Sequence, residues 1–238
     1  ALAEPDAEDP STTWLHNPES PVPSVSGNVT GFYEWVVLPP DIDAAYVPQR
    51  ARMKSLIPDG PLHQLERDST VGASTPPALL ADRPDVNVFE TEPLESDIEM
   101  TGPIAVNLWI SSDATDTDFT AKLLDVYPPT EGYPDGFHLP LADSILRARY
   151  REGFDAEMLM EPGTVYELQI ELPPISNLFT RGHRIRVDIS SSNFPRFDVN
   201  PNTGEPIGRH TGSQVARNTV FTDANHPSHI VLPIVSST

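Results

Sequence analysis

Alternation between apolar and polar residues is the feature that most constrains the fold of this chain. From residue 86 onward, short runs carry apolar side chains at every second position, as in Ile104, Val106, Leu108 and Ile110. A period of two positions is that of a β-strand with one buried and one exposed face. No segment keeps a period of 3.6 residues, so the sequence predicts an all-β fold.

Further runs follow the same pattern, and Pro, Gly and Asp residues separate them as turns separate short strands. We expect eight or nine strands in two antiparallel sheets packed face to face, because each strand has one apolar face. The predicted fold is a jelly-roll β-sandwich. The additional expected strands cover residues 86–89, 94–100, 119–127, 145–151, 165–172, 184–189 and 230–234.

The first 84 residues lack this alternation. Residues 1–31 are rich in Pro, Ser and acidic residues and are expected to be loops, whereas residues 33–38 (YEWVVL) form one short expected strand. A long irregular connection of this kind typically runs over the surface of a domain. We therefore expect one domain, in which residues 1–84 lead into and wrap a β-sandwich core formed by residues 85–238.

Charge excludes two classes of partner. The chain has 15 Lys and Arg against 35 Asp and Glu, which gives a formal net charge of −20. A nucleic-acid-binding face needs clustered cations, and an anionic membrane surface attracts basic segments, so we expect neither partner. The cations are almost all Arg, and only Lys54 and Lys122 are Lys. Low Lys content fits a salt-adapted surface and equally a coding bias toward Arg.

No membrane insertion is expected, because apolar runs such as IVLPIV at 230–235 are far shorter than the roughly 20 residues that span a bilayer. The first residues, ALAEPDAEDPS, lack the basic and apolar regions of a signal peptide. The sequence leaves open whether the protein is cytoplasmic or secreted, and it leaves the oligomeric state open.

The sequence contains no recognisable catalytic motif. A serine nucleophile of the α/β-hydrolase type sits in a G-x-S-x-G turn, and no such pentapeptide occurs. The zinc-protease motif HExxH, a phosphate-binding P-loop and a dinucleotide-binding GxGxxG are also absent. The chain has no Cys, which excludes thiolate chemistry. We predict no catalytic residue, no metal site and no cofactor.

Two polar clusters invite a second interpretation. His226 and His229 have a spacing seen in metal sites, but Pro227 disfavours a helix, and we expect a turn residue and a strand residue. The stretch SSDATDTDF at 111–119 has three Asp residues, which either cap turns and strands or hold a Ca²⁺ ion. Since it lacks the pattern of an EF-hand, we favour the structural role.

Histidine and arginine residues on the strands are expected to have structural partners. His183 opens the strand 184–189, where a structural hydrogen bond is the simplest role. The Arg residues of LRARYR (146–151) and GHRIR (182–186) alternate along strands. With so many carboxylates available, cross-strand ion pairs are the expected explanation, and a docking surface for another domain is the alternative.

The loop SSNFPRFDVNPNTG (191–204) is the most unusual stretch. Two aromatic residues flank a Pro-Arg pair, and apolar rings on a loop need something to pack against. They either close the open end of the sandwich or face a second domain or a ligand cleft. The candidate interface or cleft-wall residues are Asn193, Phe194, Pro195, Arg196, Phe197 and Asp198.

The same loop carries a resemblance to a known family. GHRIRVDISSSNFPRFDVNPNTG (182–204) resembles the C-terminal domain of the X-prolyl dipeptidyl peptidase, cocaine esterase and α-amino-acid ester hydrolase family. The likeness extends to SSDATDTDFTAKLLDVYP (111–128), LADSILRARYRE (141–152) and HPSHIVLPIV (226–235). NPESPVPSVSGN (17–28) is similar to the start of that domain, although Ser26-Gly27 stands where the family usually has two glycines.

This resemblance implies a jelly-roll domain, similar to galactose-binding modules, that accompanies an α/β-hydrolase catalytic domain in the same or a separate chain. In that family the Ser, Asp and His of the triad lie in the catalytic domain, so none is carried over to this chain. The C-terminal domain packs on the catalytic domain and helps to wall the substrate cleft. In related esterases the wall residues come from early in this domain, near residues 27–35 here. Residues 29–84 depart from the esterase pattern, so no wall role is assigned to Phe32, Tyr33 or Trp35.

Two other functions are consistent with the sequence. Galactose-binding-like sandwiches often bind sugars, so a carbohydrate-binding module is the main alternative, with Trp14, Trp35 and Trp109 as the available Trp residues. A stand-alone scaffold that docks a separate hydrolase chain is the other. We expect the chain to be the non-catalytic domain of a serine hydrolase that cleaves ester, amide or X-Pro dipeptide bonds.

Overall fold

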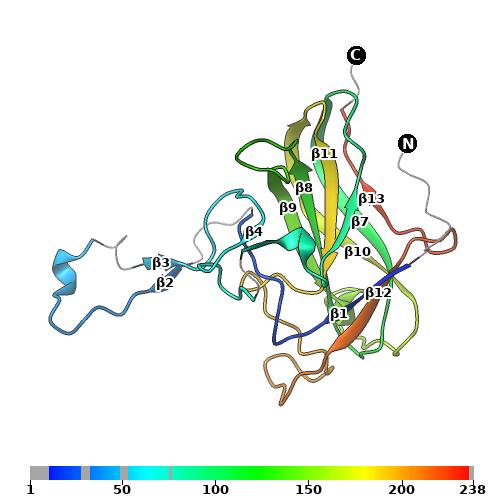
Figure 1. Ribbon diagram of the computed structural model, residues 1–238. Coiled ribbons are helices and arrows are strands. Elements are labelled where there is room, and N and C mark those ends of the chain that lie inside the picture. The colour runs from blue at the N-terminus through cyan, green and yellow to red at the C-terminus, as the bar shows by residue number, and fades with distance from the viewer. Residues whose placement is uncertain (1–10, 28–32, 49–52, 75–76, 236–238) are drawn as a thin grey trace.

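Two antiparallel sheets form the body of the protein (Figure 1). The computed structural model describes residues 11–27, 33–48, 53–74 and 77–235. The first sheet has the order β1-β12-β7-β10, and β13 pairs with β7 beyond the end of β12. Its strands are β1 (Ser11–His16), β12 (Ala216–Phe221), β7 (Ile98–Ser112), β10 (Tyr166–Phe179) and β13 (His229–Val231).

The second sheet has the order β6-β11-β8-β9. With β13 left aside, the eight sandwich strands taken in chain order make one sheet of strands 1-8-3-6 and another of strands 2-7-4-5. This order, with repeated crossing between the sheets, is that of a jelly roll. The predicted all-β sandwich is confirmed, and the likeness to galactose-binding modules stays a prediction. The strands are β6 (Asn87–Glu90), β11 (Arg184–Ser190), β8 (Asp118–Val126) and β9 (His138–Arg147).

The core lies between the two sheets and follows the alternation in the sequence. Every second residue of β7 points inward, from Ile104 to Ile110, and β8 and β10 do the same. Each such side chain stabilises the fold by about 1.5–3 kcal/mol through burial of its apolar surface. The centre of the core comprises Ile104, Val106, Leu108, Ile110, Phe119, Ala121, Leu123, Leu168, Ile170 and Phe179.

Parts of the chain between β1 and β6, which we call the N-terminal segment, lie against the outer face of the second sheet. Val22, Val25, Leu80 and Val86 form a separate apolar cluster there. The segment includes the short pairs β2 (Tyr33–Trp35) with β3 (Met53–Ser55) and β4 (Leu65–Glu66) with β5 (Ala78–Leu79), and the 3-10 turns η1 (Ala44–Tyr46) and η3 (Leu80–Asp82). In Figure 1, the β2–β3 hairpin and η1 lie away from the sandwich. No helix in the described ranges is long and apolar enough to cross a membrane.

Four local expectations were wrong. The separate strand expected at 94–100 does not form, because β7 begins at Ile98 and continues unbroken to Ser112. β1 falls where we expected loops, and β12 was not predicted at all. The inward residues of these paired strands include His16 and Asn218, so neither strand shows a clean apolar alternation. The strand expected at 145–151 lies earlier, as β9, and residues 148–150 form the 3-10 turn η4 (Ala148–Tyr150).

Candidate functional site

A row of charged side chains crosses the outer face of the second sheet. Lys122 on β8 stands opposite Asp188 on β11 and opposite Asp143 on β9. Their neighbours Ala121 and Ile189 face the core, so the charged residues point away from it. All three are nevertheless buried, because the N-terminal segment covers them. We call Lys122, Asp143 and Asp188 the polar row.

Hydrogen bonds join the polar row to the covering segment. The Lys122 ammonium donates to the Gln64 side-chain oxygen at 2.8 Å, and the Gln64 amide donates to Ser26 Oγ and to the Leu62 carbonyl. Asp188 accepts two hydrogen bonds from the Arg186 guanidinium, at 2.6 and 2.8 Å. A buried charge needs such partners, and the bonds through Gln64 tie Ser26 and Leu62 to the sheet.

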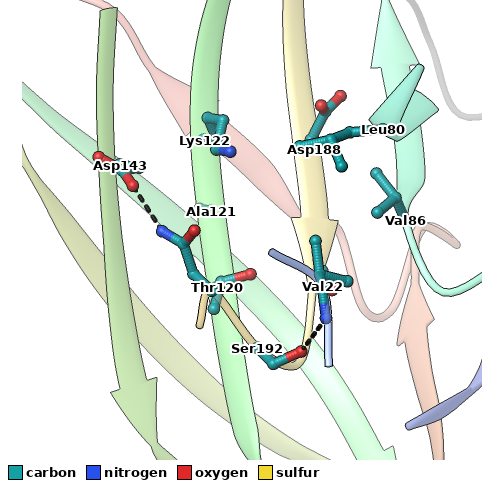
Figure 2. Close-up of a pocket in the computed structure, with 11 residues that line it drawn as sticks. Val22, Leu80, Val86, Thr120, Ala121, Lys122, Asp143, Asp188 and Ser192 are labelled. Carbon is teal, nitrogen blue, oxygen red and sulfur yellow. Dashed lines mark hydrogen bonds between the residues drawn. The ribbon is translucent and has the colours of Figure 1, made fainter. Parts of the chain in front are cut away.

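Burial lowers the pKa of Lys122, while Asp143 and Asp188 oppose this change. A hollow of about 20 Å³ lies beside the row, lined by Val22, Leu80 and the polar row (Figure 2). That volume has room for about one water molecule and not for a substrate. The polar row therefore fastens the N-terminal segment to the sandwich.

The loop singled out in the sequence packs on the same segment. Phe194 exchanges backbone hydrogen bonds with residues on both sides of Pro23, donating to the Val22 carbonyl at 2.9 Å and accepting from the Ser24 amide at 2.6 Å. The Phe194–Pro195 peptide bond is cis. The Phe194 ring lies so close to Gly72 that a Cβ there would be 3.1 Å from it. Phe194 thus has packing partners within this chain.

Asn193 and Arg196 reach from the loop to the polar row. The Asn193 amide donates to Asp143 at 2.6 Å, and its oxygen accepts from Ser24. Arg196 forms an ion pair with the other Asp143 oxygen, and its guanidinium lies 5.2 Å from the centre of the Phe197 ring. These contacts with Asp143 and Ser24 therefore anchor the loop to the sheet and to the N-terminal segment.

The remaining candidates of the loop face outward to differing degrees. Pro195 and Phe197 are half-buried, and Asp198 is exposed. The structure thus brings the six predicted residues into one anchored loop, with Asn193 and Arg196 turned inward. Their role at an interface or cleft stays a prediction.

A second polar network occupies the stretch with three Asp residues. Asp116 accepts from Arg149 at 2.8 Å, Asp118 accepts two hydrogen bonds from Arg147, and Asn200 donates to both carboxylates. Asp118 and Arg147 are directly opposite across β8 and β9, which confirms the expected cross-strand ion pairing for Arg147. Arg186 instead pairs with Asp188 of its own strand.

The Ca²⁺ alternative for this stretch receives no support. Asp113 caps the backbone of Arg217 at 2.7 Å, while the other two carboxylates of the stretch are occupied by arginines. Within the described ranges, no three His, Cys, Asp or Glu side chains gather as metal ligands would.

The histidines have structural partners. His183 forms a 2.8 Å hydrogen bond with Asp125, as expected. His226 lies in a turn against Asp223 and His229 begins β13, which confirms the interpretation of HPSH. In the part of the chain that the structure describes, no histidine ring is hydrogen-bonded to a Ser or Thr hydroxyl, the arrangement that activates a serine nucleophile.

Comparison with known proteins fits this picture of a structural domain. Residues 4–231 match the profile of the X-Pro dipeptidyl-peptidase C-terminal non-catalytic domain. The chain belongs to this family. The X-Pro dipeptidyl-peptidase C-terminal domain is thus present over nearly the whole sequence, including the N-terminal segment and the loop at 191–204.

Relatives of this C-terminal domain are hydrolases. The cocaine esterase of Rhodococcus sp. (strain MB1 Bresler) is 47% identical over 156 residues, which cover 65% of this chain and 26% of the esterase. A solved α-amino acid ester hydrolase aligns with 98% of this chain and 34% of its own, at 29% identity and a TM-score of 0.71. An aminopeptidase from a Thaumarchaeota archaeon aligns with 99% of this chain and 35% of its own, at 28% identity and a TM-score of 0.71. The chain thus spans between a quarter and about a third of these relatives.

Sequence reasoning missed the polar row and Gln64. A signal was present, since Lys122 is a rare Lys inside the apolar strand FTAKLLDV. A charged side chain in such a strand must be hydrogen-bonded if another segment buries it. Here that segment carries Gln64, and its irregular sequence does not predict where it lies on the sheet. Phe32 lies outside the described residues, as do the side chains of Tyr33 and Trp35.

Proposed function

We propose that this chain packs on the α/β-hydrolase catalytic domain of a serine hydrolase that cleaves ester, amide or X-Pro dipeptide bonds, and helps to shape its substrate cleft. The observation that carries the proposal is the family match to a domain described as non-catalytic. The solved relatives extend the argument, because the sandwich accounts for only about a third of each.

The loop at 193–198 is the proposed contact surface. Its inner side chains fix the backbone to Asp143 and to residues 22–24, while Phe197 and Asp198 remain accessible. A rigid loop that presents an aromatic ring loses little conformational entropy on docking. Aromatic residues of this kind commonly dominate the energy of protein interfaces.

The first test is catalysis by the 238-residue chain alone. We expect no turnover of p-nitrophenyl acyl esters or of X-Pro chromogenic amides, because the nucleophile belongs to the partner domain. Hydrolysis that survives purification to homogeneity and is blocked by a serine-directed inhibitor would contradict the proposal.

The second test is docking. The α/β-hydrolase domain of the parent protein, produced separately, should bind this chain, and Phe197→Ala should weaken binding about tenfold. Phe154→Ala is the matched control, since Phe154 is 81% exposed on another loop. Equal effects of the two substitutions on binding would show that the loop is not part of the interface. If the unaltered chain does not bind the catalytic domain, the docking role is wrong.

The carbohydrate-binding alternative gains no specific support from Trp14 and Trp109, the Trp residues whose side chains the structure describes. Trp14 is a core residue, 3% exposed, whose indole donates to Ser191. Trp109 lies on the outer face of β7 with its ring against His226. The relatives reported above are hydrolases, and the docking role is therefore the one we propose.

A further inference from the structure

A second, larger hollow lies between the N-terminal segment and the connection from β8 to β9. Its volume is about 180 Å³, roughly nine times that of the hollow beside the polar row. An engineered cavity of about 150 Å³ in another protein is large enough to bind benzene. This pocket therefore has room for one six-membered ring and a small substituent. We call it the His63 pocket; it is lined by Ser24, Val25, Leu56, Pro58, Leu62, His63, Arg67, Ser69, Thr70, Tyr133 and Phe137.

One wall of the His63 pocket is aromatic. The His63 and Phe137 rings are stacked, with centres 5.2 Å apart and planes at 26°. Tyr133 meets both of these rings edge-on, at 5.2 and 4.9 Å. Each ring fixes the others, so the wall is formed before any ligand arrives. Preformed aromatic walls bind planar apolar groups.

His63 presents a defined donor at this wall. Its Nδ1 accepts a hydrogen bond from the His138 backbone amide at 3.0 Å, so in the neutral ring Nε2 carries the proton. Burial lowers the pKa of His63, and the charges of His138 and Arg67 lower it further. The ring is therefore neutral at pH 7, with its proton on Nε2.

A turn that contains Arg67 contributes a cation and two hydroxyl groups to the lining of the pocket. Residues 67–70 form a turn closed by a hydrogen bond from the Thr70 amide to the Arg67 carbonyl, and Thr70 Oγ1 accepts from the Arg67 amide. The Arg67 guanidinium is exposed and has no hydrogen bond or ion pair with the residues that the structure describes. The Ser69 and Thr70 hydroxyls lie in the same turn.

A single Arg beside two hydroxyls suits one carboxylate. The planar guanidinium matches the two carboxylate oxygens, and hydroxyl groups can donate to the same oxygens. One Arg balances the single negative charge of a carboxylate.

We infer that the His63 pocket binds a small aromatic carboxylate, with its ring against His63, Phe137 and Tyr133 and its carboxylate at Arg67. This inference goes beyond the proposed docking function and does not depend on it, because every lining residue belongs to this chain.

The test uses the 238-residue chain with benzoate as the probe, followed by ligand-detected NMR or calorimetry. We expect benzoate to bind at least tenfold more tightly than benzamide, which keeps the ring but loses the charge. Acetate, which keeps the charge but loses the ring, should also bind at least tenfold more weakly. Benzoate binding no tighter than that of either analogue would overturn the inference.

Substitutions locate the site. Arg67→Gln should weaken benzoate binding about tenfold and leave benzamide unchanged, whereas Tyr133→Ser should weaken both. Arg209→Gln removes the same charge from another exposed loop and should have no effect. Because Arg67 and Arg209 are exposed, we expect their variants to keep the thermal midpoint of the parent, whereas Tyr133→Ser loses two edge-on ring contacts and should lower it slightly. Equal loss in the Arg67 and Arg209 variants would show nonspecific attraction and exclude the pocket.

Discussion

At the scale of single residues, His16 is a buried histidine whose ring cannot readily take a proton. It is 1% exposed, and its Nε2 has no hydrogen-bond partner. Burial lowers its pKa from 6.5 to about 4, although a hydrogen bond to the Asn200 backbone favours the charged form. Between these two values the unfolded chain binds more protons than the folded one, so stability must fall as the pH falls.

His16→Asn should flatten this dependence. The free energy of unfolding should drop through His16 by roughly 3 kcal/mol from about pH 6.5 to 4 in the parent, because each pKa unit is worth about 1.36 kcal/mol. Urea titrations at several pH values measure the slope. The substitution also lowers the free energy of unfolding at every pH. The quantity to compare is therefore the slope of that free energy against pH. His210→Asn, at an exposed histidine, should leave the slope unchanged, and parallel curves for parent and His16→Asn would refute the account.

The ion pair of Asp116 with Arg149 is the second residue-scale prediction. Their side chains are 0% and 2% exposed, and Asp116 also accepts from Asn200. Asp116→Asn removes the buried carboxylate that pairs with Arg149 and leaves the half-exposed Glu157 as its remaining ion-pair partner, which should cost about 3 kcal/mol. The control is Glu92→Gln, because Glu92 is 95% exposed and lies 3.9 Å from Arg184; its loss should cost under about 1 kcal/mol. Denaturant midpoints that shift equally in both variants would contradict this difference.

At the scale of elements, the connection from β8 to β9 depends on one glycine. Gly136 has φ = 82°, and a Cβ there would lie 2.2 Å from the Tyr127 carbonyl oxygen. We expect Gly136→Ala to destabilise the protein by more than about 2 kcal/mol, since both the backbone angle and the space exclude a side chain. Gly132, in the same connection, has no atom within 4 Å of such a Cβ. Gly132→Ala should therefore change the thermal midpoint little, and a Gly136→Ala midpoint as high as that of Gly132→Ala would disprove the steric argument.

The elements that sequence could predict are those whose inward residues are all apolar. The central strand β7 carries Ile104 to Ile110 at alternate positions and was predicted directly. β1 and β12 pair with each other across some 200 residues of sequence, and they bury His16 and Asn218 among apolar neighbours. Alternation does not reveal strands whose inward polar residues are satisfied by distant partners, as the Thr117 and Ser191 hydroxyls satisfy the Asn218 amide.

At the scale of the whole molecule, the candidate site combines sheet residues, whose positions the sequence predicts, with a covering segment, whose position it does not. The sheet positions of Lys122, Asp143 and Asp188 follow from strand alternation once the strands pair. Their burial follows only from the segment that carries Gln64 and Ser26, whose irregular backbone is placed by these same hydrogen bonds. Sequence therefore identified the loop at 193–198 but not the polar row to which Asn193 and Arg196 attach it.

The charge of the whole molecule leads to the last prediction. A formal net charge of −20 on 238 residues makes the folded state repel itself, and this repulsion weakens when salt shortens the Debye length. The ion pairs of the polar row and of Asp116 are buried and are screened much less. Raising NaCl from 0.02 to 0.5 M should therefore raise the thermal midpoint by several degrees, which corresponds to about 1–2 kcal/mol of unfolding free energy for a domain of this size.

A variant that neutralises the exposed carboxylates Glu95, Glu131 and Asp155 should have a higher midpoint at low salt and should gain less from added NaCl. A midpoint that falls with salt would mean that surface ion pairs such as Arg184 with Glu90 outweigh the net repulsion.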